Sequence, residues 1–370
     1  MKIGTITFWD TEENYGQVLQ CYALIKYLQK HGHQATLIRT KPLVGSKRTV
    51  IQKVFTLLVM ARHPRSLISF FKRTPKTKSN AALPIVDRGF AQFKIKYIPS
   101  TSSIFSYEDL VNSPLDYDAI ICGSDQIWSA ISPLMFLQFP GKFKRIAYAA
   151  SFGGFQIKNI LDRKQVKFWL DSFDFISVRE KEGVEMCLSL GAKAFLFPDP
   201  TLLLNKSDYE GIIGDSVIKN DKPYILLYLL GNKIDVDVKL FFDFAHLKGI
   251  DIKYVASQGR TDDFEKVFPS IPEWLSLIRN ARAVITNSFH GTVFSLIFNT
   301  PFITVPLSGN VTRMNGRITD LLSKYHLEDR LFMGNLECLL EDANFSLFNK
   351  VKEEDCKFVT NLMSNLLVEK

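Results

Sequence analysis

With 370 residues, the chain is long enough for two domains of ordinary size, each with its own hydrophobic core. Its composition, 46% hydrophobic and 23% charged, is that of a globular protein, and no apolar run approaches the roughly 20 residues of a membrane-spanning helix. The five cysteines are scattered, without CxxC or histidine spacing, which argues against a disulfide framework and a structural metal. Because the first residues enter a strand without a signal peptide, we expect a cytoplasmic protein.

The first predicted unit is a strand, a helix and a second strand. The strand covers residues 2–8, and the helix that follows has apolar residues at a 3.6-residue rhythm and stops before Gly32. The turn between strand and helix contains Asn14, Tyr15 and Gly16. Open α/β sheets bind ligands at such turns, so these three residues are candidates for substrate contacts.

The net charge of +8 comes from one segment. Residues 41–80 contain ten Lys or Arg, and no Asp or Glu occurs from residue 15 to residue 86. Two apolar stretches, 50–61 and 66–71, run between the basic residues. This pattern is typical of helices that lie in a membrane interface, and a helical hairpin with solvated charges is the alternative.

Strands and helices alternate again after this segment, which indicates a parallel sheet over residues 1–204. Each predicted strand ends in polar residues: Ser124, Asp125 and Gln126 after the first, Ser151 after the next, then Arg179 and Glu180, then Asp199. Each of these also has a purely structural interpretation. Asp125 could cap a helix, Asp199 could brace a turn between two prolines, and Arg179 could form a surface ion pair with Glu180 or Glu182.

A second set of strands begins near Lys222, after a polar stretch, 205–222, that we interpret as a linker. We assign residues 205–346 to a second α/β domain and residues 347–370 to a last helix that packs back on the first domain. The predicted fold is α/β, with two doubly wound, Rossmann-like parallel sheets facing a cleft.

The stretch from Ala283 to Pro306 predicts a buried strand, a polar turn, an apolar helix and another strand. Ser288 is placed to cap the helix, whose free N–H groups and positive end favour an anion. His290 lies beside this end and could bind the anion or move a proton. A cap and a buried ring without any ligand are the alternative.

In a doubly wound sheet the carboxyl ends of the strands share one edge, so these distant polar residues are expected to converge. A histidine and an arginine on opposite domains would suit an anionic substrate held between them.

Six blocks of the sequence, in order, resemble the polysaccharide pyruvyl transferase family. They are TITFWDTEENYGQVLQCYALIKYL, YDAIICGSDQIWS, RIAYAASFG, ISVREKEGVE, FPDPTLLL and VITNSFHGTVFSLIFNTPFI, and they lie between residues 5 and 303, most of the chain. The resemblance implies a GT-B-like fold and transfer of the pyruvyl skeleton of phosphoenolpyruvate to a sugar, as a cyclic ketal. It places Arg179 and His290 at the phosphoenolpyruvate, and Asn287 stands where the family often has Asp.

The chemistry agrees with these residues. Phosphoenolpyruvate has a carboxylate and a phosphate, which match a guanidinium and a helix N-terminus. Its C3 gains a proton during the reaction, a task for a general acid such as His290. Asp125, Glu180 or an acidic residue of the first turn could deprotonate the acceptor, and the sequence does not choose among them; no metal or other cofactor is required.

We therefore predict a phosphoenolpyruvate-dependent enzyme that acts on a lipid-linked sugar of a bacterial surface glycan, at the inner face of the membrane. Catalytic roles are assigned to His290, Arg179 and Asp125; donor binding to Arg179, Asn287, Ser288, His290 and Gly291; and acceptor binding to Asn14, Tyr15, Gly16, Ser124 and Gln126. A bulkier residue at Gly291 is expected to block the donor without changing the melting temperature of the empty protein. The alternatives are a GT-B glycosyltransferase with a nucleotide-sugar donor and a non-catalytic assembly factor. A nucleic-acid partner is not expected, because the basic residues are not part of a recognised nucleic-acid-binding motif.

Overall fold

The computed structural model describes residues 1–41, 86–216, 222–231, 235–257, 260–307, 312, 315–341 and 343–368. The described residues belong to one compact unit. Apart from Lys41, the basic segment 41–80 lies outside the described residues, so its proposed role at a membrane stays a prediction.

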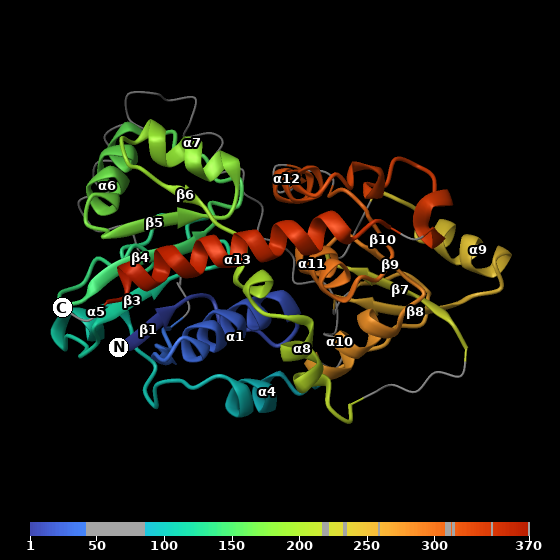
Figure 1. Cartoon of the computed structure of the whole chain (residues 1–370), viewed down its shortest axis with the longest axis horizontal. Coiled ribbons are helices and arrows are strands. Elements are labelled where there is room, and N and C mark those ends of the chain that lie inside the picture. The colour runs from blue at the N-terminus through green and yellow to red at the C-terminus, as the bar shows by residue number, and fades with distance from the viewer. Residues whose placement is uncertain are drawn as a thin grey trace, which may run out of the picture. The chain divides into compact units, whose positions relative to one another are not determined.

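The first sheet has six parallel strands in the order β2-β1-β3-β4-β5-β6 (Figure 1). Their bounds are β1 Lys2–Ile6, β2 Gln34–Leu37, β3 Ala119–Cys122, β4 Lys144–Ala150, β5 Phe175–Val178 and β6 Phe195–Leu196. The chain winds outward in one direction from β1 to β2 and in the other from β3 to β6. The point of reversal therefore lies between β1 and β3, where a sheet of this type binds ligands.

The second sheet has four parallel strands in the order β10-β9-β7-β8. Their bounds are β7 Tyr224–Leu229, β8 Asp251–Ala256, β9 Ala283–Thr286 and β10 Phe302–Thr304. Its point of reversal lies between β7 and β9. Two doubly wound parallel sheets confirm the predicted fold class.

Helices connect most successive strands, whereas residues 123–143 join β3 to β4 without a helix and the last two helices follow β10. The helices are α1 Tyr15–Lys30, α4 Phe90–Tyr97, α5 Tyr107–Asn112, α6 Ile160–Leu170, α7 Lys181–Ser189, α8 Lys206–Ile213, α9 Lys239–Leu247, α10 Ile271–Asn280, α11 Phe289–Phe298, α12 Gly316–Lys324 and α13 Ser346–Leu366, with short 3₁₀ turns at Pro200–Leu203, Glu328–Arg330 and Glu337–Leu340. Their starts follow ordinary capping rules: Asn14 caps α1, Ser288 caps α11, and Ser270 forms a capping box with Glu273 at α10.

One continuous hydrophobic core joins the two sheets. Successive residues of a buried strand point to opposite faces, so one face of each sheet contributes to this shared core, which α1, α10, α11 and α13 also line. At its centre the Tyr15 ring stacks on Trp274, with the ring centroids 4.8 Å apart, and its hydroxyl donates a hydrogen bond to the Pro269 carbonyl at 2.6 Å. The opposite faces of the two sheets have separate cores.

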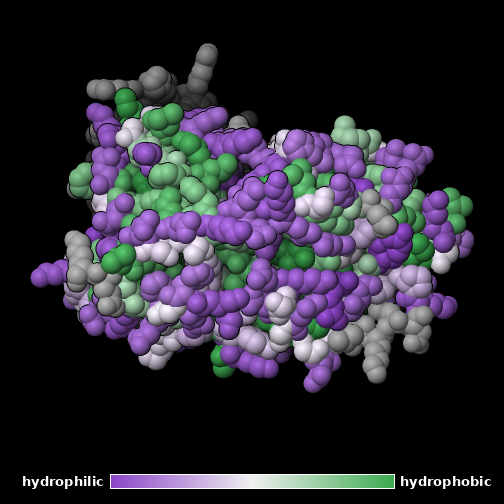
Figure 2. Space-filling model, in the orientation of Figure 1, coloured by the Kyte–Doolittle hydropathy of each residue, from purple (hydrophilic) through white to green (hydrophobic). Residues whose placement is uncertain are grey.

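The last helix, α13, contacts residues of the first sheet's half. The Tyr27 and Thr360 hydroxyls are 3.1 Å apart, the Lys144 ammonium donates to the Leu366 carbonyl, and the Phe358 ring lies against Phe197. In Figure 2 a band of polar residues follows the outward face of α13. None of the helices in the described ranges is long and apolar enough to cross a membrane.

The polar stretch 205–222 differs from the prediction of a linker. Its first half forms α8, and Tyr209, Ile212 and Ile213 of this helix are buried in the shared core. Tyr209 packs edge-on against Phe294 of α11. The helix has only eight residues and polar residues surround it in the sequence. Its apolar periodicity is therefore too short to identify a helix from the sequence alone.

Candidate active site

The buried carboxylate of Asp199 is the centre of a polar cluster between the two sheets. It lies directly after β6 and is 1% exposed. Its Oδ2 is 2.7 Å from Arg179 Nη1, 3.4 Å from the Ser124 hydroxyl that donates to it, and 3.5 Å from His290 Nε2. Its Oδ1 accepts hydrogen bonds from the backbone N–H and the hydroxyl of Thr201. The sequence interpretation of Asp199 as a turn brace was incomplete, because the same carboxylate also joins Arg179 to His290.

This arrangement determines the charge of Asp199. Burial by itself would raise the pKa of the carboxyl group, but His290, Arg179 and the Thr201 N–H hold it well below its usual range. The pKa of Arg179 is correspondingly raised: burial disfavours its charge, and the carboxylates of Asp199, Glu180 and Asp125 outweigh burial. A permanent ion pair therefore lies beside the His290 ring.

Strand ends bring the predicted catalytic residues together. Arg179 follows β5, and its Nη2 is 4.0 Å from Oδ1 of Asp125, which follows β3. Asp125 in turn accepts a hydrogen bond from the Gln17 amide of α1 at 3.3 Å. His290, in the first turn of α11, comes from the second sheet. The convergence of Arg179, Asp125 and His290 is as expected from the edge shared by parallel strands.

Gly16 explains how the two halves approach each other here. A Cβ at this position would lie 2.0 Å from His290 Nδ1, so only glycine lets the first turn of α1 pack against the imidazole. Asn14 caps α1 by accepting from the Gln17 N–H. Asn14 and Gly16, two of the five residues predicted to bind the acceptor, are thus observed supporting α1 and its contact with His290.

Of the other three residues predicted to bind the acceptor, two are fully buried and one is half-buried. Tyr15 is fully buried in the shared core, and Ser124 is fully buried with its hydroxyl on the Ala149 carbonyl and Asp199. Neither is at a surface where it could contact a sugar. Gln126 is half-buried, and with its amide oxygen turned toward Arg317 it accepts from both terminal nitrogens of that guanidinium, at 2.8 and 2.9 Å.

The residues predicted to bind the donor around His290 mainly hold the turn. The Asn287 amide oxygen accepts from the Leu230 N–H at 2.7 Å and its nitrogen donates to the Leu230 carbonyl at 3.0 Å, which clamps β9 to the end of β7. The Ser288 hydroxyl accepts from the Gly291 N–H at 3.2 Å. A Cβ at Gly291 would lie 2.5 Å from the Thr286 hydroxyl oxygen. The expectation that a bulkier residue there leaves the empty protein unaffected is therefore wrong, because it would collide with β9.

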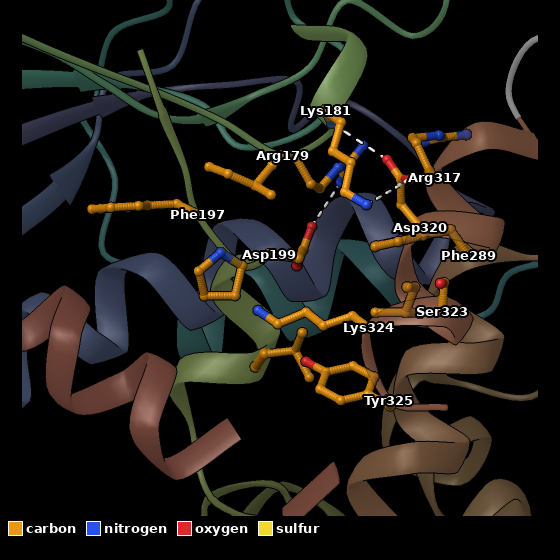
Figure 3. Close-up of a pocket in the computed structure, with 14 residues that line it drawn as sticks. Arg179, Lys181, Phe197, Asp199, Phe289, Arg317, Asp320, Ser323, Lys324 and Tyr325 are labelled. Atoms are coloured by element: carbon orange, nitrogen blue, oxygen red, sulfur yellow. Dashed lines mark hydrogen bonds and ion pairs between the residues drawn. The ribbon is translucent and has the colours of Figure 1, made fainter. Parts of the chain in front are cut away.

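A cavity of about 330 Å³ opens beside Arg179 and Asp199 (Figure 3). Its cationic residues are Arg179, Lys181, Arg317 and Lys324, and its acidic residues are Asp199 and Asp320. The remaining wall is largely apolar: Leu196, Phe197, Pro198, Leu202, Phe289, Leu321 and Tyr325, with Ser323. The excess of positive charge suits an anionic ligand of small size. We call this space the cationic cavity.

Two guanidinium groups flank the Phe289 ring at the cavity wall. Arg179 lies 4.8 Å and Arg317 5.6 Å from the ring centroid. Burial and the neighbouring Arg179 lower the pKa of Arg317 to about 10, so both groups are still positively charged at neutral pH. Two like charges this close repel each other, and an anion bound between them would relieve that repulsion.

Arg179 also offers free hydrogen-bonding capacity. It is 8% exposed, and within the described structure its Nε and Nη2 have no hydrogen-bond partner. Arg317, Lys181 and Lys324 were not predicted from the sequence. They lie on α7 and α12, and no motif in the sequence distinguishes these cations from solvated surface residues.

Among the described residues, no group of three His, Cys, Asp or Glu side chains is arranged to hold a metal ion. The site instead combines guanidinium, ammonium and imidazole nitrogens with the carboxylates of Asp199, Asp125, Glu180 and Asp320. Such a set matches an anionic organic substrate.

Comparison with solved structures finds similar structures at low sequence identity. One is UDP-GlcNAc 2-epimerase from Neisseria meningitidis bound to UDP-GlcNAc, with 11% identity, a TM-score of 0.46 and coverage of 96% of this chain and 100% of that chain. Another is MnaA of S. aureus with UDP, at 12% identity, a TM-score of 0.48 and coverage of 100% and 99%. The Streptomyces glycosyltransferase SsfS6 has 10% identity, a TM-score of 0.37 and coverage of 99% and 96%. No substrate or role is transferred from these enzymes at such levels of similarity.

Of the two sequence comparisons, the one with protein-family models identifies the family. No curated protein matches the chain significantly. The family model of polysaccharide pyruvyl transferases, however, matches residues 14–309, a range that includes β1-to-α1 turn residues, Arg179, Asp199 and His290. The chain belongs to the polysaccharide pyruvyl transferase family.

Proposed function

We propose that the protein transfers the pyruvyl group of phosphoenolpyruvate to a sugar of a bacterial surface glycan and forms a pyruvate ketal. The observation that carries this proposal is the cationic cavity, where four cationic side chains line one small space against two carboxylates. Phosphoenolpyruvate has two anionic groups, and a guanidinium binds either of them through paired hydrogen bonds. The family membership supplies the reaction class.

The proposed reaction uses the cluster around Asp199. A sugar hydroxyl attacks C2 of phosphoenolpyruvate, and the electron pair of the C2–C3 double bond takes a proton at C3 from His290. Asp199 stays ionised and lies 3.5 Å from His290 Nε2, so it helps to hold the ring in position. A second hydroxyl then attacks C2 as the bond to phosphate breaks, and the ketal forms.

Arg179 and Arg317 would stabilise the charge of the phosphate throughout these steps. Preorganised cations in a site closed from water act strongly on charge that develops during the reaction, because they need no reorganisation. The acceptor is proposed to be lipid-linked, and the basic segment 41–80 would hold the enzyme at the inner face of the membrane.

Thermal denaturation tests the donor. Phosphoenolpyruvate at millimolar concentration should raise the melting temperature of the purified protein, and UDP-GlcNAc and inorganic phosphate at the same concentration serve as comparisons. Stabilisation by the nucleotide sugar but not by phosphoenolpyruvate would overturn the proposal in favour of a glycosyltransferase.

Variants of the cationic cavity refine this test. Arg179→Ala should remove a charge-assisted contact worth roughly 1.5 to 3 kcal/mol, and Arg179→Lys should restore only part of it. Because Arg179→Ala also leaves Asp199 without its partner, Lys181→Ala is the second variant. Lys181 is largely exposed and its loss should weaken phosphoenolpyruvate binding a few-fold without unfolding the protein. Unchanged donor affinity in both Ala variants would sink the assignment of this cavity.

A further inference from the structure

A second cavity, of about 300 Å³, lies next to the cationic cavity and has the opposite charge balance. Four carboxylates line it, Glu180, Glu182, Glu185 and Asp320, against two cations, Lys181 and Arg317. It lies between the first turns of α7 and α12, beside Gly154. A trianionic donor would be repelled from such a space, so this acidic cavity calls for a different ligand.

The two cavities share a wall. Lys181, Arg317 and Asp320 line both of them, and Lys181 and Asp320 are joined across that wall by an ion pair at 3.8 Å. Arg179 and Glu180 follow β5 one after the other, and Arg179 lines the cationic cavity while Glu180 lines the acidic one. The two cavities are therefore adjacent and have three lining residues in common.

Glu180 has the one feature here that points directly to a ligand. It is only 5% exposed, and its Oε1 accepts hydrogen bonds from the Ser151 hydroxyl at 2.7 Å and the Phe152 N–H at 3.0 Å. Its Oε2 has no hydrogen-bond partner in the described structure, and Arg179 Nε is 4.0 Å away. A buried carboxylate oxygen without a donor is costly, and a hydroxyl group bound in the cavity would supply that donor.

The Glu180 carboxylate does not act as a helix cap. Glu180 occupies the N-cap position of α7, but its side chain makes no capping hydrogen bond. Its two hydrogen bonds go instead to the loop after β4, and they aim the carboxylate without occupying Oε2. The side chain is thus fixed through Oε1, while Oε2 is buried and lacks a hydrogen-bond partner among the described residues.

We infer that the acidic cavity is the subsite of the sugar acceptor and that Glu180 Oε2 removes the proton of the attacking hydroxyl. The inference rests on the proposed function and chooses among the bases that the sequence left open. Neutral sugars are bound in proteins through hydroxyl groups that donate to carboxylates, which is the chemistry this cavity offers. Of the residues predicted to bind the acceptor, Gln126 is near this subsite, through its contact with Arg317.

The step balances without a further reactant. The O–H bond of the acceptor breaks and its proton goes to Glu180, while the oxygen forms a bond to C2 and C3 takes its proton from His290. In the second half of the reaction the other hydroxyl attacks C2, and its proton leaves with the phosphate as HPO₄²⁻. Solvent carries the proton from Glu180 back to His290, which restores both groups.

The test compares Glu180→Gln with the wild type. Glutamine retains Oε1 for Ser151 and Phe152 and replaces only the oxygen that has no hydrogen bond, so the variant should fold. The acceptor probe is the glycan fraction extracted from a strain that lacks this gene. Two quantities are measured: the release of phosphate from phosphoenolpyruvate, and the rise in melting temperature that phosphoenolpyruvate alone produces.

Glu180→Gln should lower phosphate release by at least about 100-fold, the usual effect of losing a general base, and retain the shift in melting temperature. Glu180→Asp, which keeps a shorter carboxylate, should recover part of the rate. Glu354→Gln, which removes an exposed carboxylate from α13, should change neither quantity and controls for the loss of one charge.

Phosphate release within about threefold of the wild type would overturn the role of Glu180 and leave the proposed function standing. Loss of the phosphoenolpyruvate-induced shift together with turnover would also overturn it, because Glu180 would then act only by supporting Arg179. A wild-type protein that releases no phosphate from phosphoenolpyruvate with this acceptor would overturn the proposed function, and the role of Glu180 with it.

Discussion

At the scale of single residues, the site depends on one carboxylate that contacts both an arginine and a histidine. Asp199 is fully buried and contacts Arg179 and His290, which come from different sheets. Buried charges are tolerated only when they are paired and hydrogen-bonded, and both oxygens of Asp199 meet this condition. The carboxylate therefore stabilises the fold and orients the proposed general acid at once.

Replacement of Asp199 tests its contribution to stability. Asp199→Asn should lower the free energy of unfolding by about 3 to 5 kcal/mol, because it leaves Arg179 buried without its main partner. The pKa of Asp199 is held far below that of an unfolded carboxyl group, about 3.9, so its contribution is complete above that pH and declines as the pH falls below it. Urea unfolding should thus show a constant difference between pH 7 and pH 5 that shrinks below about pH 4. A difference that persists undiminished at pH 3 would contradict this.

Replacement of His290 tests its role in proton transfer. His290→Gln keeps a polar side chain of similar length but cannot deliver the proton to C3, so turnover should fall by about 10² to 10⁴. The rise in melting temperature caused by phosphoenolpyruvate should persist, since Arg179 and Arg317 are unchanged. Turnover within a few-fold of the wild type would make His290 a binding or structural residue.

At the scale of the elements, two helices meet through their first turns. The start of α1 packs against His290 in the first turn of α11, and Gly16 is what permits this approach. Asn287, just before α11, fixes the same turn to the end of β7 through two hydrogen bonds to Leu230. The position of the imidazole is thus determined by backbone packing on one side and an amide clamp on the other.

Two glycine-to-alanine substitutions distinguish the effect of close packing at Gly16 from the general effect of alanine on helix stability. Gly16→Ala should displace the His290 ring, lower the free energy of unfolding by about 1 to 3 kcal/mol and reduce turnover. Gly211→Ala on α8 is the matched control: no atom lies within 4 Å of the added methyl group, so it should stabilise the protein by up to about 1 kcal/mol. Thermal unfolding and phosphate release measure the two effects, and equal behaviour of the two variants would refute the close packing of Gly16.

How far the sequence predicts this site depends on which elements supply it. Strand ends and the SFHG turn were identifiable, so Arg179, Asp125 and His290 were correctly expected to lie together. Tyr15 was misplaced, because a tyrosine after a polar turn gives no sign that its ring stacks on Trp274, about 260 residues away along the chain. Arg317 and Lys324 were missed for the same reason, since tertiary packing alone brings α12 to the site.

At the scale of the whole molecule, the charge is concentrated in residues 41–80. Wild-type protein should float with vesicles that contain anionic lipid and be released at high salt, because each Lys or Arg near such a surface contributes about 1 kcal/mol. Charge reversal at Lys53, Arg62, Arg65 and Lys72 should abolish flotation and spare activity on a soluble acceptor. Equal flotation of both proteins would exclude a lipid-binding role for these four residues.

The shared core has a consequence for dissection of the chain. A fragment that ends at residue 204 would keep all six strands of the first sheet but expose Tyr15, whose ring stacks on Trp274 of α10 in the intact protein, and the apolar residues around it. Such an apolar surface promotes self-association, so the fragment would aggregate, and calorimetry of the intact protein would show one endotherm. By the same reasoning, a chimera that joins one half of this protein to the other half of a relative would fold only if the residues at positions 15 and 274 still packed against each other.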